Sequence, residues 1–117
     1  MNTSERGRAG EQLAADYLAG KGYQIVDRNY HCRWGELDLV AKKDDLIVFV
    51  EVKLRRDDRF SSAIEAVTYQ KQRKLRAAAS MWLAEKSCDL PARFDVVEVY
   101  TGTRRLLHTE NAFDASI

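Results

Sequence analysis

The chain has 117 residues, of which 45% are hydrophobic and 32% are charged. This composition excludes a disordered or fibrous chain and predicts a single globular domain over residues 1–117, long enough to bury a core. The formal net charge of +1 excludes a globally basic nucleic-acid-binding protein, so any basic surface must be local.

The cysteines and the N-terminus indicate the compartment. Cys32 and Cys88 have neither metal-binding nor redox spacing, so we interpret them as reduced thiols of a cytoplasmic protein. The first residues lack the apolar core of a secretory signal, and no apolar run is long enough to span a bilayer. We therefore expect no membrane partner.

The N-terminal segment has the pattern of a helix that begins at Thr3 or Ser4 and ends near Lys21, before Gly22. Its predicted apolar stripe consists of Leu13, Ala14, Tyr17 and Leu18. Glu11 falls on the core-facing edge of this helix, but the residues alone favour a first-turn acid that interacts with the helix dipole. Residues 23–27 predict a short strand, and residues 28–33 a polar connection.

Residues 34–53 predict two apolar strands joined by a polar turn at residues 43–45. A two-residue turn at Asp44 and Asp45 would place Lys43 opposite Leu46. Counting back along an antiparallel pair, Asp38 would then face Glu51, and Glu36 would face Lys53. Because side chains repeat every second residue, all four charged side chains would share one face.

Charges within such apolar strands are costly unless they are paired or bind something. Two carboxylates at cross-strand distance repel each other unless a cation lies between them, and oxygen ligands with open water positions suit Mg²⁺ or Mn²⁺. A lysine beside them, Lys53, would hold an attacking water or stabilise charge on a phosphate. Asp38, Glu51 and Lys53 are therefore the candidate catalytic residues.

Two alternatives remain open from the residues. A three-residue loop would shift the register by one and place Asp38 and Glu51 on opposite faces. The second alternative is an edge hairpin with a solvated face, in which Glu36 and Lys53 form an ordinary cross-strand ion pair.

After Lys53, residues 54–60 are dense in charge and predict a loop that is either a substrate-facing basic arm or simply solvated. Residues 62–65 have capping-box spacing, and a helical pattern continues to about Lys86, with a new start at Thr68. Its predicted buried stripe consists of Leu75, Ala78, Ala79, Trp82 and Leu83. Its early turns carry the densest basic cluster, which would track a phosphate backbone or be an exposed face: Gln70, Lys71, Arg73, Lys74 and Arg76.

The C-terminal part predicts a strand over residues 93–100, a turn at 101–103 and a short strand over 105–108, with Phe113 docking on the core. His108 is a lone histidine that favours a structural role. The predicted order is helix, three strands, long helix and two strands. This order indicates an α/β fold with a mixed sheet of about five strands, in which the third and fourth strands are parallel neighbours joined by a right-handed crossover.

The chain resembles the YraN-like family of the PD-(D/E)xK nuclease superfamily, which is related to the archaeal Holliday-junction resolvases. The ordered set of motifs spans almost the whole chain and is specific, although each motif alone is weak. The matching positions are Gly10-Glu11, Gly22-Tyr23, Arg28-Asn29-Tyr30, residues 35–40, residues 48–53, Arg55, Lys71, residues 93–97 and residues 111–113.

The resemblance implies a restriction-endonuclease-like core and a DNA endonuclease that uses Mg²⁺ or Mn²⁺. Asp38, Glu51 and Glu11 would be the metal-ligating acids, and Lys53 the catalytic lysine. Arg55, Gln70, Lys71 and Lys74 would contact nucleic acid, and Glu36 matches the family without an assigned role. The substrate would be branched or single-stranded DNA, and a symmetric junction would require a homodimer. The alternative is a non-catalytic module that binds nucleic acid or a DNA-processing protein.

Overall fold

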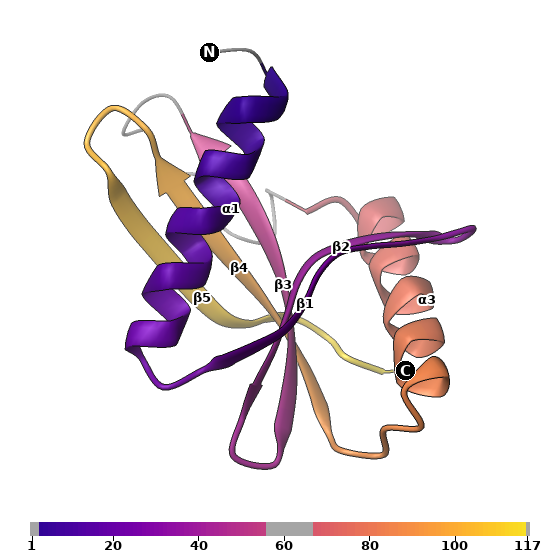
Figure 1. Ribbon diagram of the computed structural model, residues 1–117. Helices are drawn as coiled ribbons and strands as arrows, with labels where there is room; N and C mark the ends of the chain where they lie inside the picture. The colour runs from indigo at the N-terminus through magenta and orange to yellow at the C-terminus, as the bar shows by residue number, and fades with distance from the viewer. Residues whose placement is uncertain (1–2, 56–66, 117) are drawn as a thin grey trace.

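The computed structural model describes residues 3–55 and 67–116 (Figure 1). The elements in chain order are α1 (Thr3–Gly20), β1 (Gln24–Cys32), β2 (Gly35–Lys43), β3 (Leu46–Arg55), α3 (Tyr69–Glu85), β4 (Ala92–Tyr100) and β5 (Arg105–Phe113). The strands form a five-stranded sheet in the order β1-β2-β3-β4-β5. The pair β3–β4 is parallel and the other pairs are antiparallel, which confirms the predicted mixed α/β architecture.

The two helices cover opposite faces of the sheet because alternate strand residues pack into different cores. Val48 and Val50 of β3 pack with the buried side chains of α1, Ala14, Ala15 and Leu18. Ile47 and Phe49 pack instead with the buried side chains of α3, including Leu75 and Trp82. This period of two is the one expected of a strand buried on both faces. The strand β3 is thus held firmly at the centre of the molecule.

Several boundaries differ from those predicted. Residues 28–32 of the predicted polar connection belong to β1, which continues to Cys32 and pairs with β2 as far as Cys32–Gly35, so only Arg33 remains in the turn. Polar side chains are tolerated there because this end of the hairpin is largely exposed. Strand β3 extends to Arg55 and β5 to Phe113, because both continue their ladders with β4.

The helices also refine the prediction. Thr68 caps α3, its hydroxyl oxygen accepting a hydrogen bond from the Lys71 N–H at 3.2 Å, so the new helix start predicted at Thr68 is confirmed. The predicted capping box at residues 62–65 and the charged segment after Arg55 lie outside the described residues. Leu13 was expected in the apolar stripe of α1 but is 37% exposed. No helix in the described part of the chain is long and apolar enough to cross a membrane.

Candidate active site

The turn between β2 and β3 has the predicted length, and its register confirms the two-residue turn. Lys43 pairs with Leu46, and the ladder continues to the pair Leu39–Val50. Asp44 adopts a positive φ of 54°, which aspartate tolerates in a tight hairpin turn. The three-residue alternative, which would have separated Asp38 from Glu51, is therefore wrong.

On the N-terminal side of Leu39, strand β2 rotates about its axis and no longer pairs with β3. Leu37 packs in the core beneath α3, whereas Leu39, two residues on, packs in the core beneath α1. Residues two apart share a face in a regular strand, so the chain must rotate at the intervening residue, which is Asp38. Figure 1 shows the β1–β2 hairpin bending away from β3 toward α3. The divergence opens the sheet beside Asp38.

Asp38 bridges the gap with its side chain. Its Oδ2 accepts a hydrogen bond from the backbone N–H of Val52 at 2.8 Å. A carboxylate thus satisfies a backbone donor of β3 beyond the last backbone pair, Leu39–Val50. The bond fixes the Asp38 carboxylate against β3 next to Glu51, so the two predicted acids do lie together.

Glu51 is buried, with only 7% of its surface exposed. Burial raises the pKa of Glu51 to about 8; hydrogen bonding and repulsion from Asp38 add to the rise, and the ammonium groups of Lys71 and Lys53 oppose it. Lys71 Nζ lies 3.6 Å from Glu51 Oε2, and this oxygen has no hydrogen-bond partner among the described residues. The described neighbours of Glu51 therefore leave one buried carboxyl oxygen without a hydrogen bond, and the anionic form of Glu51 is disfavoured.

Glu36 does not face Lys53 as the predicted register required. It pairs across the other ladder with His31, and the two side chains form an ion pair of 3.0 Å between His31 Nδ1 and Glu36 Oε2. The prediction was wrong because β2 rotates at Asp38, so the register of the turn cannot be extrapolated beyond that residue. The Glu36–Lys53 ion pair of the solvated-hairpin alternative is likewise absent from the described part of the chain.

Glu11 approaches from α1 and belongs to the same electrostatic environment. Burial raises the pKa of Glu11, as do the charges of Asp38 and Glu36, while Arg28 opposes them. With its amide nitrogen turned toward α1, Asn29 donates to Glu11 Oε1 at 2.7 Å and to Oε2 at 3.2 Å. Asn29 has a positive φ of 51°, a conformation that asparagine tolerates better than most residues.

Two of the three predicted metal-ligating carboxylates, Asp38 and Glu51, lie together and suit a divalent cation. Over residues 3–55 and 67–116, no three His, Cys, Asp or Glu side chains group closely enough to hold a metal ion. Asp38 and Glu51 form a pair of neighbouring carboxyl groups, and Glu51 Oε2 is a buried oxygen without a hydrogen-bond partner among the described residues. Mg²⁺ is commonly held by one or two carboxylates, with water or phosphate oxygens completing its shell. The pair suits such an ion, and Glu11 stands as a neighbouring carboxylate.

Sequence reasoning missed one buried acid on this face, Glu98 of β4. It is fully buried and lies beside Lys53 in the parallel ladder. Its Oε2 accepts from Arg55 Nε at 3.1 Å, whereas its Oε1 has no hydrogen-bond partner within the described residues. The available signal was an acid flanked on both sides by valines in a buried strand, Val97 and Val99. Glu98 thus fixes Arg55 at the end of β3.

The predicted nucleic-acid-binding residues of α3 divide into two groups. Lys71 reaches the carboxylates, as described above, while Gln70 and Lys74 are exposed. Lys71 and Lys74 also line a cavity of about 440 Å³ between α3 and the end of the β1–β2 hairpin. His31 and Glu36 form part of its opposite wall. Lys71 therefore contacts Glu51 and also lines the cavity between the hairpin end and α3.

The C-terminal motif has a structural arrangement of its own. Asp95 is fully buried and accepts hydrogen bonds from Arg93 Nε and Nη2 at 2.8 Å and from the Asn111 N–H at 3.0 Å. His108 Nε2 lies 2.7 Å from Asp95 Oδ2. These contacts join β4 to β5, which agrees with the structural role predicted for His108.

Comparison with known proteins identifies relatives of similar length. The model of the uncharacterised protein family UPF0102 matches residues 10–99. A UPF0102 protein of Clostridioides difficile is 41% identical, over 97% of this chain and 100% of the relative. One from Syntrophomonas wolfei is 51% identical, over 93% of this chain and 97% of the relative. The solved structure of Pyrococcus furiosus SfsA in complex with Ca²⁺ aligns with 93% of this chain and 64% of its own, at a TM-score of 0.36 and 14% identity.

Proposed function

The chain belongs to uncharacterised protein family UPF0102, and we propose that it is a divalent-metal-dependent endonuclease that cleaves phosphodiester bonds in DNA. The observation that carries the proposal is the carboxylate pair Asp38–Glu51, in which Glu51 is buried and its Oε2 has no hydrogen-bond partner among the described residues. The resemblance to PD-(D/E)xK nucleases supports the same assignment. Branched and single-stranded DNA are the proposed substrates, and action on a symmetric junction would require two sites in a homodimer.

Each side chain has a role in this proposal. The carboxylates of Asp38 and Glu51 hold Mg²⁺ or Mn²⁺, with Glu11 as a further acid beside them. When bound, the ion supplies Lewis acidity at the phosphate and makes water a better nucleophile. Lys53 stabilises the charge that develops on the phosphate. Glu51 must be deprotonated to bind the cation, and the ammonium groups of Lys53 and Lys71 favour that deprotonation.

A cleavage assay tests the proposal. Labelled four-way junction, flap, single-stranded and duplex DNA would be incubated with Mg²⁺ or Mn²⁺ and either wild type or Glu51→Gln. Gln keeps the volume of the side chain but removes the charge that the cation needs. Cleavage by wild type alone is expected. Equal cleavage by both proteins would reveal a contaminant, and no cleavage on any substrate would overturn the nuclease assignment.

The second candidate is a binding module that recognises nucleic acid or a DNA-processing protein without cleavage. The observation that favours it is the ion pair between Lys71 Nζ and Glu51 Oε2, at 3.6 Å. A cation from the protein itself already lies beside the carboxylate, as would suit a site that works without metal. Binding of DNA by wild type with unchanged affinity after addition of EDTA, and without cleavage, would favour this candidate.

A further inference from the structure

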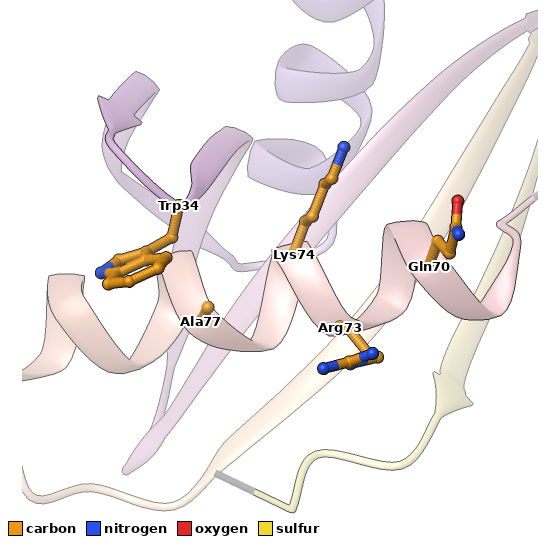
Figure 2. Close-up of a pocket in the computed structure, with 5 residues that line it drawn as sticks. All are labelled: Trp34, Gln70, Arg73, Lys74 and Ala77. Atoms are coloured by element: carbon orange, nitrogen blue, oxygen red, sulfur yellow. The ribbon is translucent and has the colours of Figure 1, made fainter.

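A second cavity lies on α3 beside the end of the β1–β2 hairpin. It has a volume of about 440 Å³ and is lined by Trp34, Gln70, Arg73, Lys74 and Ala77. Figure 2 shows the indole of Trp34 beside Ala77 at one end and Gln70 at the other, with Lys74 and Arg73 projecting to opposite sides. Trp34 is 48% exposed, an unusual state for so large an apolar ring that packs in neither core.

The end of the β1–β2 hairpin is fitted closely to α3, and this contact places Trp34. A Cβ atom at Gly35 would lie only 3.2 Å from the backbone oxygen of Lys74 and 3.4 Å from its Cβ. Glycine therefore permits the hairpin to approach the helix backbone. Because Trp34 directly precedes Gly35, its ring is held over the helix.

The surroundings of the ring are cationic. The guanidinium of Arg33 lies 4.5 Å from the centroid of the Trp34 ring. Arg73 and Lys74 are exposed, and neither forms an ion pair with a residue in the described part of the chain. An exposed aromatic ring among cations that have no ion-pair partner within residues 3–55 and 67–116 suits a ligand that has both a flat π-surface and negative charge.

We propose that this cavity binds an unpaired nucleobase stacked on Trp34, with Arg73 and Lys74 contacting the adjacent phosphates. A base in a duplex is already stacked on its neighbours, whereas an unpaired base offers a free face to an aromatic side chain. The inference rests on the proposed function and narrows it: the substrate has a single-stranded segment next to the cleavage site. Its recognition is independent of sequence, because every base has a π-face.

Binding of fluorescent oligonucleotides tests the stacking. Trp34→Ala should weaken binding of single-stranded and flap DNA about tenfold and change binding of uninterrupted duplex little. Trp34→Phe, which keeps an aromatic ring, should restore most of the affinity. The salt dependence of binding should be the same in Trp34→Ala and wild type, because stacking releases no counterions.

The indole provides a readout independent of affinity. The other tryptophan, Trp82, is only 4% exposed, so acrylamide should quench mainly Trp34. Single-stranded DNA should reduce the acrylamide quenching of wild type. It should not change the quenching of Trp34→Phe, which lacks the exposed indole. If wild type binds DNA and Trp34→Ala binds each form of DNA with the affinity of wild type, the stacking proposal fails while the proposed function stands. If wild type binds no DNA, both fail.

Discussion

Asp38 and Val52 are joined by a hydrogen bond of 2.8 Å from a backbone N–H of β3 to a side-chain oxygen of β2. The bond lies where the backbone ladder between the two strands has already ended. One oxygen of Asp38 is therefore committed to the fold, and the carboxylate is still beside Glu51. This double use makes Asp38 a residue whose charge and whose hydrogen bond can be tested separately.

The substitution Asp38→Asn removes the negative charge of residue 38 and keeps its hydrogen bond. The amide oxygen of Asn can still accept from Val52, so we expect the free energy of unfolding to change by no more than about 1 kcal/mol. The negative charge is lost, so Mn²⁺ binding measured by calorimetry should disappear. A variant with the Mn²⁺ affinity of wild type would exclude Asp38 from the proposed metal site.

Glu51→Gln should change how the free energy of unfolding depends on pH, measured in protein that EDTA keeps free of metal. Burial raises the pKa of Glu51 to about 8 from an ordinary value of 4.5. A group with a raised folded pKa contributes its full stability below pH 4.5 and loses that contribution as the pH rises toward 8. Gln does not titrate and has no such loss. The unfolding free energy of the variant, relative to that of wild type, should therefore rise on the order of a few kcal/mol from about pH 5 to about pH 9.

Urea unfolding at these two pH values measures the gain. A difference in unfolding free energy between the two proteins that is the same at both pH values would contradict the buried position of the Glu51 carboxylate. Mg²⁺ should narrow the difference at high pH, because only wild type would bind the ion and be stabilised by it.

Lys71→Ala combined with Lys74→Ala should weaken DNA binding and its dependence on salt. If each lysine contacts one phosphate, removing both should reduce the slope of log affinity against log salt by about 1.4 to 1.8. Fluorescence anisotropy at several salt concentrations measures the slope. Lys86→Ala, an exposed lysine just beyond the other end of α3, is the matched control. A double variant with the slope of wild type would place the DNA on another face.

Asp95→Asn should destabilise the fold by about 3–5 kcal/mol, the usual cost of leaving a buried charge without its partner. Burial raises the pKa of Asp95, but hydrogen bonds from His108, Arg93 and the Asn111 N–H outweigh it and hold this pKa below its ordinary value. The stabilisation is therefore present above that ordinary value and lost as the pH falls through the lowered one. Urea unfolding at pH 7 measures the cost, and a loss below about 1 kcal/mol would contradict the role of Asp95.

The arrangement of the elements could be predicted from the sequence because it follows from local patterns. Apolar alternation, a two-residue turn and the capping residue Thr68 each act over a few residues, and each was located correctly. The rotation of β2 at Asp38 could not be predicted in this way. It depends on the packing of Leu37 and Leu39 against different helices, which lie far from them in the sequence.

The same limit explains the errors within the site. The pairing of Glu36 with His31 required knowing that β1 continues through a polar segment, which composition alone argues against. The burial of Glu98 could not be predicted from its own strand, because it depends on both neighbouring strands and the face above them. Trp34 could not be placed on α3 without the contact between Gly35 and Lys74.

The helix α3 links the two places where we propose that DNA is held. Lys71 lies beside Glu51, and Lys74, three residues later, lines the cavity with Trp34. Three helical residues correspond to about 4.5 Å along the axis, and the helix does not stretch. The phosphate at the carboxylates and the base on Trp34 would then be separated by a constant number of nucleotides. Cleavage would fall at a set offset from the junction between paired and unpaired DNA, whatever the sequence there.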